Sequence, residues 1–253
     1  MSDLVLVRAE GAVHPQASST ALRVTANQVV PALRGVVGAS LVLPAVMVVR
    51  EHVDGHGGSP DGQVPATVDE RGLITSIGDP IVVASDDEAH LAFVIGHELA
   101  HYHELSLRKQ AALAIPSLRA CWLWSEYYAQ RVVCAAGLMD ERLHRDLPEA
   151  KAAEQASSDD DDDGASWSYM MAFVKGQYDV DPACLDRFPS AQRKILGILL
   201  KGMKTTALDD AVRAFPHWSL TERKLVEGFF EALRVSDPAR QRRRRQRRRA
   251  RKR

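Results

Sequence analysis

The chain has 253 residues, of which 45% are hydrophobic and 26% are charged, as in an ordinary soluble globular protein. This length allows one or two domains with a sizeable buried core. The formal net charge is zero, yet the last fourteen residues contain eleven of the 33 basic side chains and no acidic one. The preceding residues combine 22 basic with 33 acidic side chains, a balance of −11, so an acidic body precedes an intensely basic tail.

Cysteine usage and the apolar segments favour a cytoplasmic protein without a membrane span. The cysteines are widely spaced and form no Cys-x-x-Cys pair, so we expect reduced, buried thiols at Cys121, Cys134 and Cys184. The N-terminus has no positive segment followed by an apolar run, and no export signal is expected. The most apolar stretch, residues 35–49, is interrupted by Pro44 and is too short to cross a membrane.

The first part of the chain combines a helix with short strands. The helix is expected over residues 25–34. Short β-branched runs predict three strands, over residues 45–50, 73–77 and 81–84. The intervening loop, residues 52–66, is rich in Gly, Pro and Asp. Its His52, Asp54 and His56 could bind a metal, but polar residues in such a loop are usually only solvated.

Two histidines four residues apart follow the third strand, in the run Gly96-His97-Glu98-Leu99-Ala100-His101. A capping box is predicted upstream, at Ser85-Asp86-Asp87-Glu88. Apolar and small residues continue from there at helical spacing, which predicts a helix from about residue 86 to 106. Residues i and i+4 share one face of a helix, so His97 and His101 can bind one zinc ion, with Glu98 beside its open side.

A second helix is expected over residues 116–136, with Gly137 just past its end. Its apolar stripe includes one acid: Trp122, Glu126, Ala129 and Val133. A buried carboxylate costs several kcal/mol unless it is paired, and metal coordination is one way to pair it. Glu126 is therefore the predicted third ligand. His90 and Glu104 lie near the ligand face of the first helix but are weaker candidates, because they are too far along it for a tetrahedral site.

The C-terminal half is polar and mainly helical in prediction. Helices are expected over residues 138–147, 149–156, 167–175, 190–203, 208–214 and 219–235. The aspartate run Asp159–Asp163 has too much like charge to fold and predicts a disordered linker. We therefore divide the chain into a core (1–156), an acidic linker (157–166), a helical region (167–238) and a disordered Arg-rich tail (239–253).

With these residues identified, the chain resembles the gluzincin metallopeptidases, in which a His-Glu-x-x-His helix is followed by a helix that supplies a glutamate ligand. It is similar to the compact ImmA/IrrE-type enzymes, or minigluzincins, whose second helix has a pattern like Glu-x-x-Ala-Asn/Asp-Arg. The corresponding run here is Glu126-Tyr127-Tyr128-Ala129-Gln130-Arg131. The resemblance covers residues 80–136. It implies that Gln130, in place of Asn or Asp, hydrogen-bonds a ligand histidine and fixes its tautomer.

The resulting prediction is an α+β, zincin-like fold that is mainly helical, with a small β-sheet before the active-site helix and one zinc ion per chain. The predicted activity is hydrolysis of peptide bonds in a protein substrate, in which zinc activates a water molecule and Glu98 accepts its proton. By resemblance, strand 81–84 aligns the extended substrate by edge pairing. The donor to the oxyanion is left open among Arg131, Tyr169, Tyr178 and His217.

The tail supports a second class of function. Its arginines have the charge density to bind RNA or DNA phosphates, or another acidic partner, without sequence specificity: Arg242, Arg243, Arg244, Arg245, Arg247, Arg248 and Arg249. The tail has no aromatic side chain for base stacking, and it could instead fold onto the acidic body. In this alternative the zinc site is structural or sensory and turns over no substrate.

Overall fold

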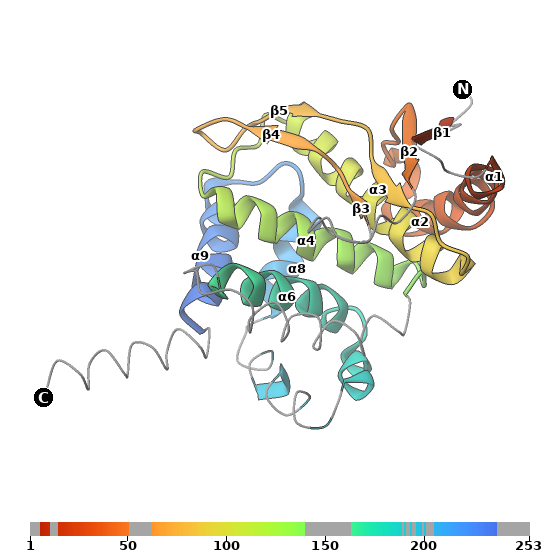
Figure 1. The fold of residues 1–253 in the computed structure, drawn as a ribbon. Helices are drawn as coiled ribbons and strands as arrows, with labels where there is room; N and C mark the ends of the chain where they lie inside the picture. Colours follow the sequence, from red (N-terminus) through yellow and green to blue (C-terminus); the bar gives the residue numbers. More distant parts are fainter. Residues whose placement is uncertain are drawn as a thin grey trace, which may run out of the picture. The chain divides into compact units, whose positions relative to one another are not determined.

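A computed structural model describes residues 6–10, 15–50, 62–139, 163–188, 190, 193, 196–198, 200 and 205–236. The described part is mainly helical with a small amount of sheet, which confirms the α+β class at that level (Figure 1). The described strands all precede residue 84, and the longest described helices follow them. No described helix has both the length and the apolarity needed to cross a membrane.

A four-stranded sheet has the order β1-β2-β6-β3. Strands β1 (Leu6–Glu10) and β6 (Ile81–Val83) both run parallel to the central β2 (Val46–Arg50). The two-residue strand β3 (Gly62–Gln63) runs antiparallel to β6. The middle of β2 is fully buried, as expected of a parallel strand that is covered on both faces. The strands predicted over 45–50 and 81–84 are therefore confirmed, whereas β1 and β3 were not predicted.

The position of β6 corrects one expectation drawn from the family resemblance. A substrate-aligning strand must have a free edge. Strand β6 has none, because Val82 is in register with Val49 of β2 on one side and with Gly62 of β3 on the other. The hydrogen-bonding groups of β6 are thus used inside the sheet, and it does not serve as an edge for a substrate.

One helical segment connects β1 to β2. Helix α1 (Pro15–Val24), the π-helical turn η1 (Thr25–Val29) and α2 (Val30–Val37) follow one another directly, so the predicted helix over 25–34 is confirmed and is longer than expected. Helix α1 contacts β1 and β2, and all three pieces contact α3 (Glu88–Gln110). The segment therefore packs against both the sheet and the helix that contains the histidine pair.

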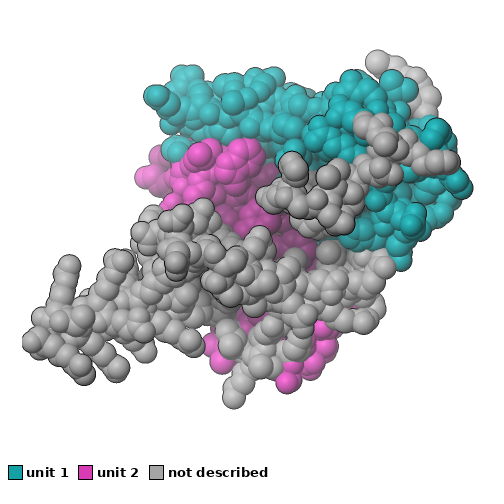
Figure 2. Space-filling model, in the orientation of Figure 1, with its two compact units in different colours: residues 1–116, 128–140 teal, residues 117–127, 141–253 magenta. Residues whose placement is uncertain are grey.

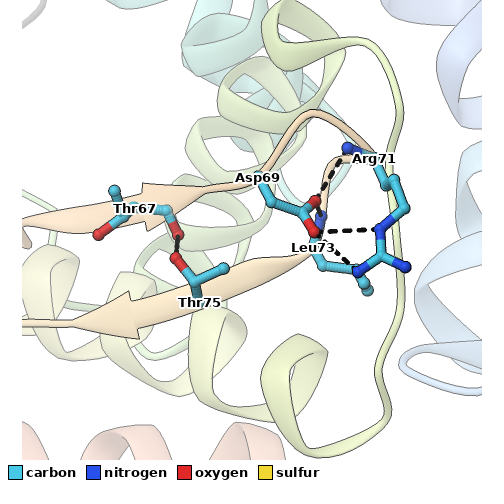
Figure 3. Close-up of polar contacts among 5 residues, drawn as sticks. All are labelled: Thr67, Asp69, Arg71, Leu73 and Thr75. Carbon is cyan, nitrogen blue, oxygen red and sulfur yellow. Dashed lines mark hydrogen bonds and ion pairs between the residues drawn. The ribbon is translucent and has the colours of Figure 1, made fainter.

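A hairpin of β4 (Ala66–Val68) and β5 (Ile74–Ile77) forms a separate two-stranded sheet beside α3. Figure 3 shows its turn, in which the Asp69 carboxylate accepts the backbone N–H groups of Arg71 and Leu73, each at 2.9 Å. The pKa of Asp69 is lowered, most of all by the hydrogen bond from the Leu73 N–H. The hydrogen bonds and the charge of Arg71 lower it further. The turn is thus fixed by one side chain.

Gly72 completes this turn and links it to α3. Its φ of 80° lies in the left-handed region that favours glycine. A Cβ here would lie 1.9 Å from the carbonyl oxygen of Ile115. The Gly72 carbonyl accepts the N–H of Ile115 at 3.1 Å and a guanidinium N–H of Arg108 at 3.3 Å. Only glycine therefore allows the hairpin to approach Ile115, in the segment between α3 and α4, this closely.

Helix α3 begins at Glu88, because Asp87 is its N-cap and Ser85 is not. The Asp87 carboxylate accepts the N–H groups of Ala89 at 2.9 Å and His90 at 3.1 Å. The Ser85 hydroxyl instead accepts the N–H of Asp87 at 3.2 Å. The predicted capping box was therefore wrong in its position. A carboxylate in the cap satisfies two free N–H groups and also interacts with the helix dipole, which is worth about 1 kcal/mol.

The chain divides into two compact units (Figure 2), which are residues Met1–Pro116 with Tyr128–Asp140, and residues Ser117–Tyr127 with Glu141–Arg253. One boundary between the units falls within α4 (Leu118–Ala135), which is one continuous helix, and the other two follow residues 116 and 140. The division expected from the sequence, with a linker over residues 157–166, stays a prediction. Helix α6 (Asp163–Tyr178) begins inside that expected linker, whose first residues lie outside the described part.

The described part of the second unit is helical. It contains η3 (Pro182–Arg187), α8 (Thr205–Ala214) and α9 (Leu220–Ser236) in addition to α6. The helix predicted over 219–235 is confirmed as α9, and its start is capped: the Ser219 N–H donates to Glu222 Oε2 at 2.8 Å, and the Ser219 hydroxyl accepts the N–H of Thr221 at 3.1 Å. An aromatic cluster packs together in this unit, made of Trp124, Tyr127, Phe215, Trp218 and Phe230. Two further helices were expected over 138–147 and 149–156, and all their residues beyond 139 lie outside the described residues.

Candidate metal centre

The two histidines of α3 face each other. Their Nε2 atoms are 3.0 Å apart, and the rings are nearly perpendicular, with centroids 4.5 Å apart and an interplanar angle of 85°. Phe93, one turn earlier, stacks on His97 with centroids 5.7 Å apart. This stacking restricts rotation of the His97 ring and was not predicted, although Phe93 precedes His97 by one helical turn. The pair of His97 and His101 on one helical face is therefore present as expected.

Close packing next to the pair depends on Gly96. A Cβ at this position would lie 2.9 Å from Leu138 Cδ1, 3.6 Å from Val29 Cγ1 and 3.7 Å from Val133 Cγ2. The first two atoms come from the segment after α4 and from η1, and the third comes from α4 itself. The missing side chain of Gly96 thus lets α4 and η1 lie close to α3 just before His97.

The third donor comes from α4. One carboxylate oxygen of Glu126 and one ring nitrogen each of His97 and His101 all lie within 4.8 Å of one another. Within the described ranges, these are the His, Cys, Asp or Glu side chains that form a group able to hold a metal ion. Glu126 is 1% exposed, and Ala129 and Val133 on the same stripe are buried too. The expected burial of Glu126 is therefore confirmed, whereas Trp122 on the predicted stripe is only half-buried.

A metal ion with tetrahedral geometry fits this group after small side-chain movements. Two imidazole nitrogens bound to one zinc ion at roughly 2.0 Å are about 3.3 Å apart, compared with 3.0 Å between the histidines here. The Glu126 oxygen lies at most 4.8 Å from the histidine nitrogens, compared with about 3.3 Å between ligand atoms of a tetrahedral site. It therefore has to move by at most roughly 1.5 Å, which rotation about the Glu side-chain torsions allows. Two imidazoles and one carboxylate also form a donor set of catalytic zinc sites, in which water takes the fourth position.

Glu98 lies on the same turn of α3 as the two histidines. It is 4% exposed, so the helix keeps its carboxylate away from bulk solvent. A shielded carboxylate next to a metal-binding pair can take a proton from a water molecule, which is the role predicted for it. The structure therefore brings together three residues of the predicted centre, His97, His101 and Glu126, whereas Glu98 is placed by its position directly after His97 on α3.

Gln130 lies one turn beyond Glu126 and is fully buried. Its amide nitrogen donates to Met139 Sδ at 3.1 Å, and its Oε1 accepts no hydrogen bond from any described residue. The hydrogen bond to a ligand histidine that the resemblance implies is therefore not formed here. The orienting role of Gln130 stays a prediction.

The two weaker ligand candidates lie outside the metal group. Glu104 pairs with Arg108 one turn later, at 3.6 Å, and both side chains are 0% exposed. Burial and the Glu104 carboxylate raise the pKa of Tyr128, so its phenol stays protonated. His90 lies in the first turn of α3, two turns before the metal group. Neither candidate is part of that group.

A third buried histidine, His103, was not singled out from the sequence. Its Nδ1 accepts the backbone N–H of Val42 at 3.0 Å, which places the ring proton on Nε2. Burial lowers the pKa of His103 to about 4, so the imidazole is neutral at physiological pH. His103 is thus a structural histidine, although it lies only two residues from His101.

No family model, curated protein or solved structure matches this chain. The support for a function comes from the geometry of the three donors. The loop histidines His52 and His56, with Asp54, and the arginines of the tail lie outside the described residues. The four candidates for the oxyanion donor remain predictions.

Proposed function

We propose that this protein is a zinc-dependent peptidase of the gluzincin type that acts on a protein or peptide substrate. One observation supports it most, the convergence of three donors from two helices. The histidine nitrogens are 3.0 Å apart, and the Glu126 carboxylate lies within 4.8 Å of them. Structural zinc sites use four protein ligands, whereas the described part of this chain offers three and leaves a position for water.

The residues of the centre have distinct roles in this proposal. Zinc, when bound, would polarise the substrate carbonyl and lower the pKa of a water molecule toward neutrality. Glu98 accepts the proton of the attacking water and returns it to the amine that leaves. Phe93 holds the His97 ring in place by stacking. Burial of Glu98 and Glu126 excludes bulk water, which strengthens every electrostatic interaction in the site.

The first test is the metal content of the purified protein and of Glu126→Ala, by elemental analysis. We expect about one zinc ion per chain in the wild type and none in the variant. Wild-type protein without zinc, purified free of chelators, would refute the proposed centre.

The second test is proteolysis of an unfolded protein substrate by Glu98→Gln. We expect this variant to keep its zinc and to lose activity by about 10²- to 10⁴-fold. Glu88 is an exposed acid on the same helix, so Glu88→Gln is the matched control. It should keep both its zinc and its proteolytic activity. Full activity in Glu98→Gln would exclude its role as general base. A wild type that binds zinc but cleaves nothing would favour the sensory alternative.

The charge distribution favours a second function that is compatible with the first. Eleven basic residues lie in the last fourteen, next to a body with a balance of −11. Such a segment neutralises several phosphates of a nucleic acid, and the release of counterions drives binding of this kind. We infer that the tail binds RNA or DNA through phosphates without reading sequence, and could bring the peptidase to a substrate bound to nucleic acid.

Fluorescence anisotropy with labelled single-stranded RNA and duplex DNA tests this second function. We expect affinity to fall by at least tenfold between roughly 50 and 200 mM salt, with similar values for unrelated sequences. A chain that ends at Ala239 should lose the binding. Replacement of the tail arginines by lysine should preserve most of it, whereas replacement by glutamine should not. Equal affinity in the truncated chain would exclude the tail as the binding segment.

A further inference from the structure

A buried phenol, acid and base meet where α4 contacts the end of α6. The Tyr127 hydroxyl donates to Asp179 Oδ2 at 2.8 Å, and Lys175 Nζ donates to Asp179 Oδ1. The side chains of Lys175 and Asp179 are 0% and 1% exposed, and Tyr127 is fully buried. Asp179 directly follows α6, and its N–H donates to the Lys175 carbonyl at 3.1 Å. We call these three residues the Tyr127 network.

Stability alone is a poor explanation for the Tyr127 network. Burial of two charges costs several kcal/mol for each ion, and apolar residues of similar volume are often at least as stabilising. The preceding turn of α6 is apolar and buried, and consists of Met171, Ala172, Phe173 and Val174. A hydrogen-bonded charge pair is directional, because hydrogen bonds hold their partners at defined distances and angles. An apolar contact in the same place would not fix the orientation of its partners.

The network fixes α4 at the residue that follows the ligand Glu126. The Tyr127 ring also packs against Trp124 and Phe230, with centroids 5.7 Å and 6.1 Å away. Packing therefore holds the ring while the hydrogen bond holds the hydroxyl. A rotation of α4 by about 20° would move a glutamate carboxylate by roughly 2 Å, about ten times the tolerance of a metal–ligand distance. The rotation of α4 thus decides whether Glu126 reaches the metal.

We propose that Tyr127, Asp179 and Lys175 are positioning residues for the metal centre, which hold α4 in the rotation that directs Glu126 toward the histidines. The inference rests on the proposed metal centre. The three residues are not ligands, and they act through the backbone of α4. Loss of the Tyr127 hydroxyl should therefore weaken zinc binding by about tenfold. Removal of a residue that orients a metal ligand typically lowers metal affinity by roughly 10- to 100-fold, and this expectation is at the lower end of that range.

The experiment measures zinc affinity by competition with a chelating dye for the full-length wild type, Tyr127→Phe, Asp179→Asn and Glu126→Ala. Ser168→Ala is the matched control, because Arg119 of α4 donates to the Ser168 hydroxyl of α6 at 2.6 Å. That hydrogen bond joins the same two helices but lies two turns from Glu126. The d–d absorption of the Co²⁺-substituted proteins reports the ligand geometry, and thermal unfolding of the metal-free proteins reports stability.

We expect Tyr127→Phe and Asp179→Asn to raise the zinc Kd by about tenfold and to shift the Co²⁺ absorption, whereas Ser168→Ala changes neither. Tyr127→Phe removes one oxygen and carries the test if Asp179→Asn fails to fold. Wild-type affinity in Tyr127→Phe, together with loss in Glu126→Ala, overturns the positioning role alone. An equal loss in Ser168→Ala also overturns it, since any weakening of α4–α6 packing would then suffice. A wild type that binds no zinc overturns the metal centre and this inference with it.

Discussion

Two neighbouring polar stretches of α3, residues 97–101 and residues 103–108, are organised in different ways. In the first stretch, two histidine nitrogens face each other at 3.0 Å and lie within 4.8 Å of a carboxylate from α4. In the second stretch, the imidazole accepts a backbone N–H at 3.0 Å, and the acid pairs with a base one turn later. Both stretches are largely buried, yet only the first directs its donor atoms to a common point.

This difference shows that burial of polar groups does not by itself identify a binding site. The groups of the second stretch find their partners elsewhere in the chain, so their role is to fix the hairpin and the segment before β2 onto α3. The donors of the first stretch converge on one another, and electron-pair donors that converge suit a cation. The predictions below separate the two stretches.

The largest expected effect is on metal affinity, and it should distinguish His101 from His103. We expect His101→Ala to lower zinc affinity by roughly a thousandfold or more, because it removes one of three donors. His103→Asn should leave the affinity within about threefold, since this side chain points to Val42 and not to the metal group. Competition with a chelating dye measures both. A comparable loss in the two variants would contradict the division of α3 into a metal stretch and a structural stretch.

The next largest effect is expected from the ion pair of the second stretch. Arg108→Met removes the guanidinium that lies 3.6 Å from the fully buried Glu104 carboxylate, and with it the hydrogen bond to the Gly72 carbonyl. Leaving a buried charge without its partner costs about 3–5 kcal/mol in the free energy of unfolding. Urea denaturation measures this loss. The double variant Glu104→Gln with Arg108→Met should recover most of it, and a single-variant loss below about 1 kcal/mol would show that the pair is not structural.

A dependence of stability on pH is expected from His103. Its pKa is about 4 in the folded chain and about 6.5 when unfolded, so between these values only the unfolded chain binds a proton. The free energy of unfolding should therefore fall by up to about 3 kcal/mol as the pH falls from 6.5 to 4, and this contribution should be constant above pH 6.5. Urea denaturation of metal-free protein across this range measures it.

The matched variant for the pH experiment is His103→Asn. Its Oδ1 can still accept the Val42 N–H but does not titrate, so the variant should be less stable by a constant amount and less dependent on pH. An identical pH dependence in wild type and variant would exclude His103 as its source.

The smallest effect is expected at Gly96, next to the first stretch. Gly96→Ala adds a methyl group 2.9 Å from Leu138 Cδ1, the mobile end of a side chain, and gains up to about 1 kcal/mol of helix propensity. These terms oppose each other, so we expect a change in unfolding free energy within about 1 kcal/mol and unchanged zinc content. Thermal unfolding and elemental analysis measure the two. A loss of zinc in a stable Gly96→Ala protein would show that the close approach of the helices sets the metal geometry.

Much of the candidate centre could be predicted because it depends on local periodicity. His97 and His101 share a face of α3 by helical spacing alone, and Glu126 was found as an acid on an apolar stripe. The strands over 45–50, 73–77 and 81–84 were likewise visible as short β-branched runs. The helix start was placed two residues too early, because Ser85 and Asp87 are both good caps and sequence alone does not rank them.

The sequence by itself thus determined the donor atoms and their spacing along each helix, because a helix repeats every 3.6 residues whatever surrounds it. Only the tertiary structure decided that β6 is an inner strand, that His103 accepts an N–H from Val42, and that Tyr127 is bonded to Asp179. Each of these features joins segments that are far apart in the chain. Their pairing depends on how the whole core packs, and no local pattern of residues encodes it.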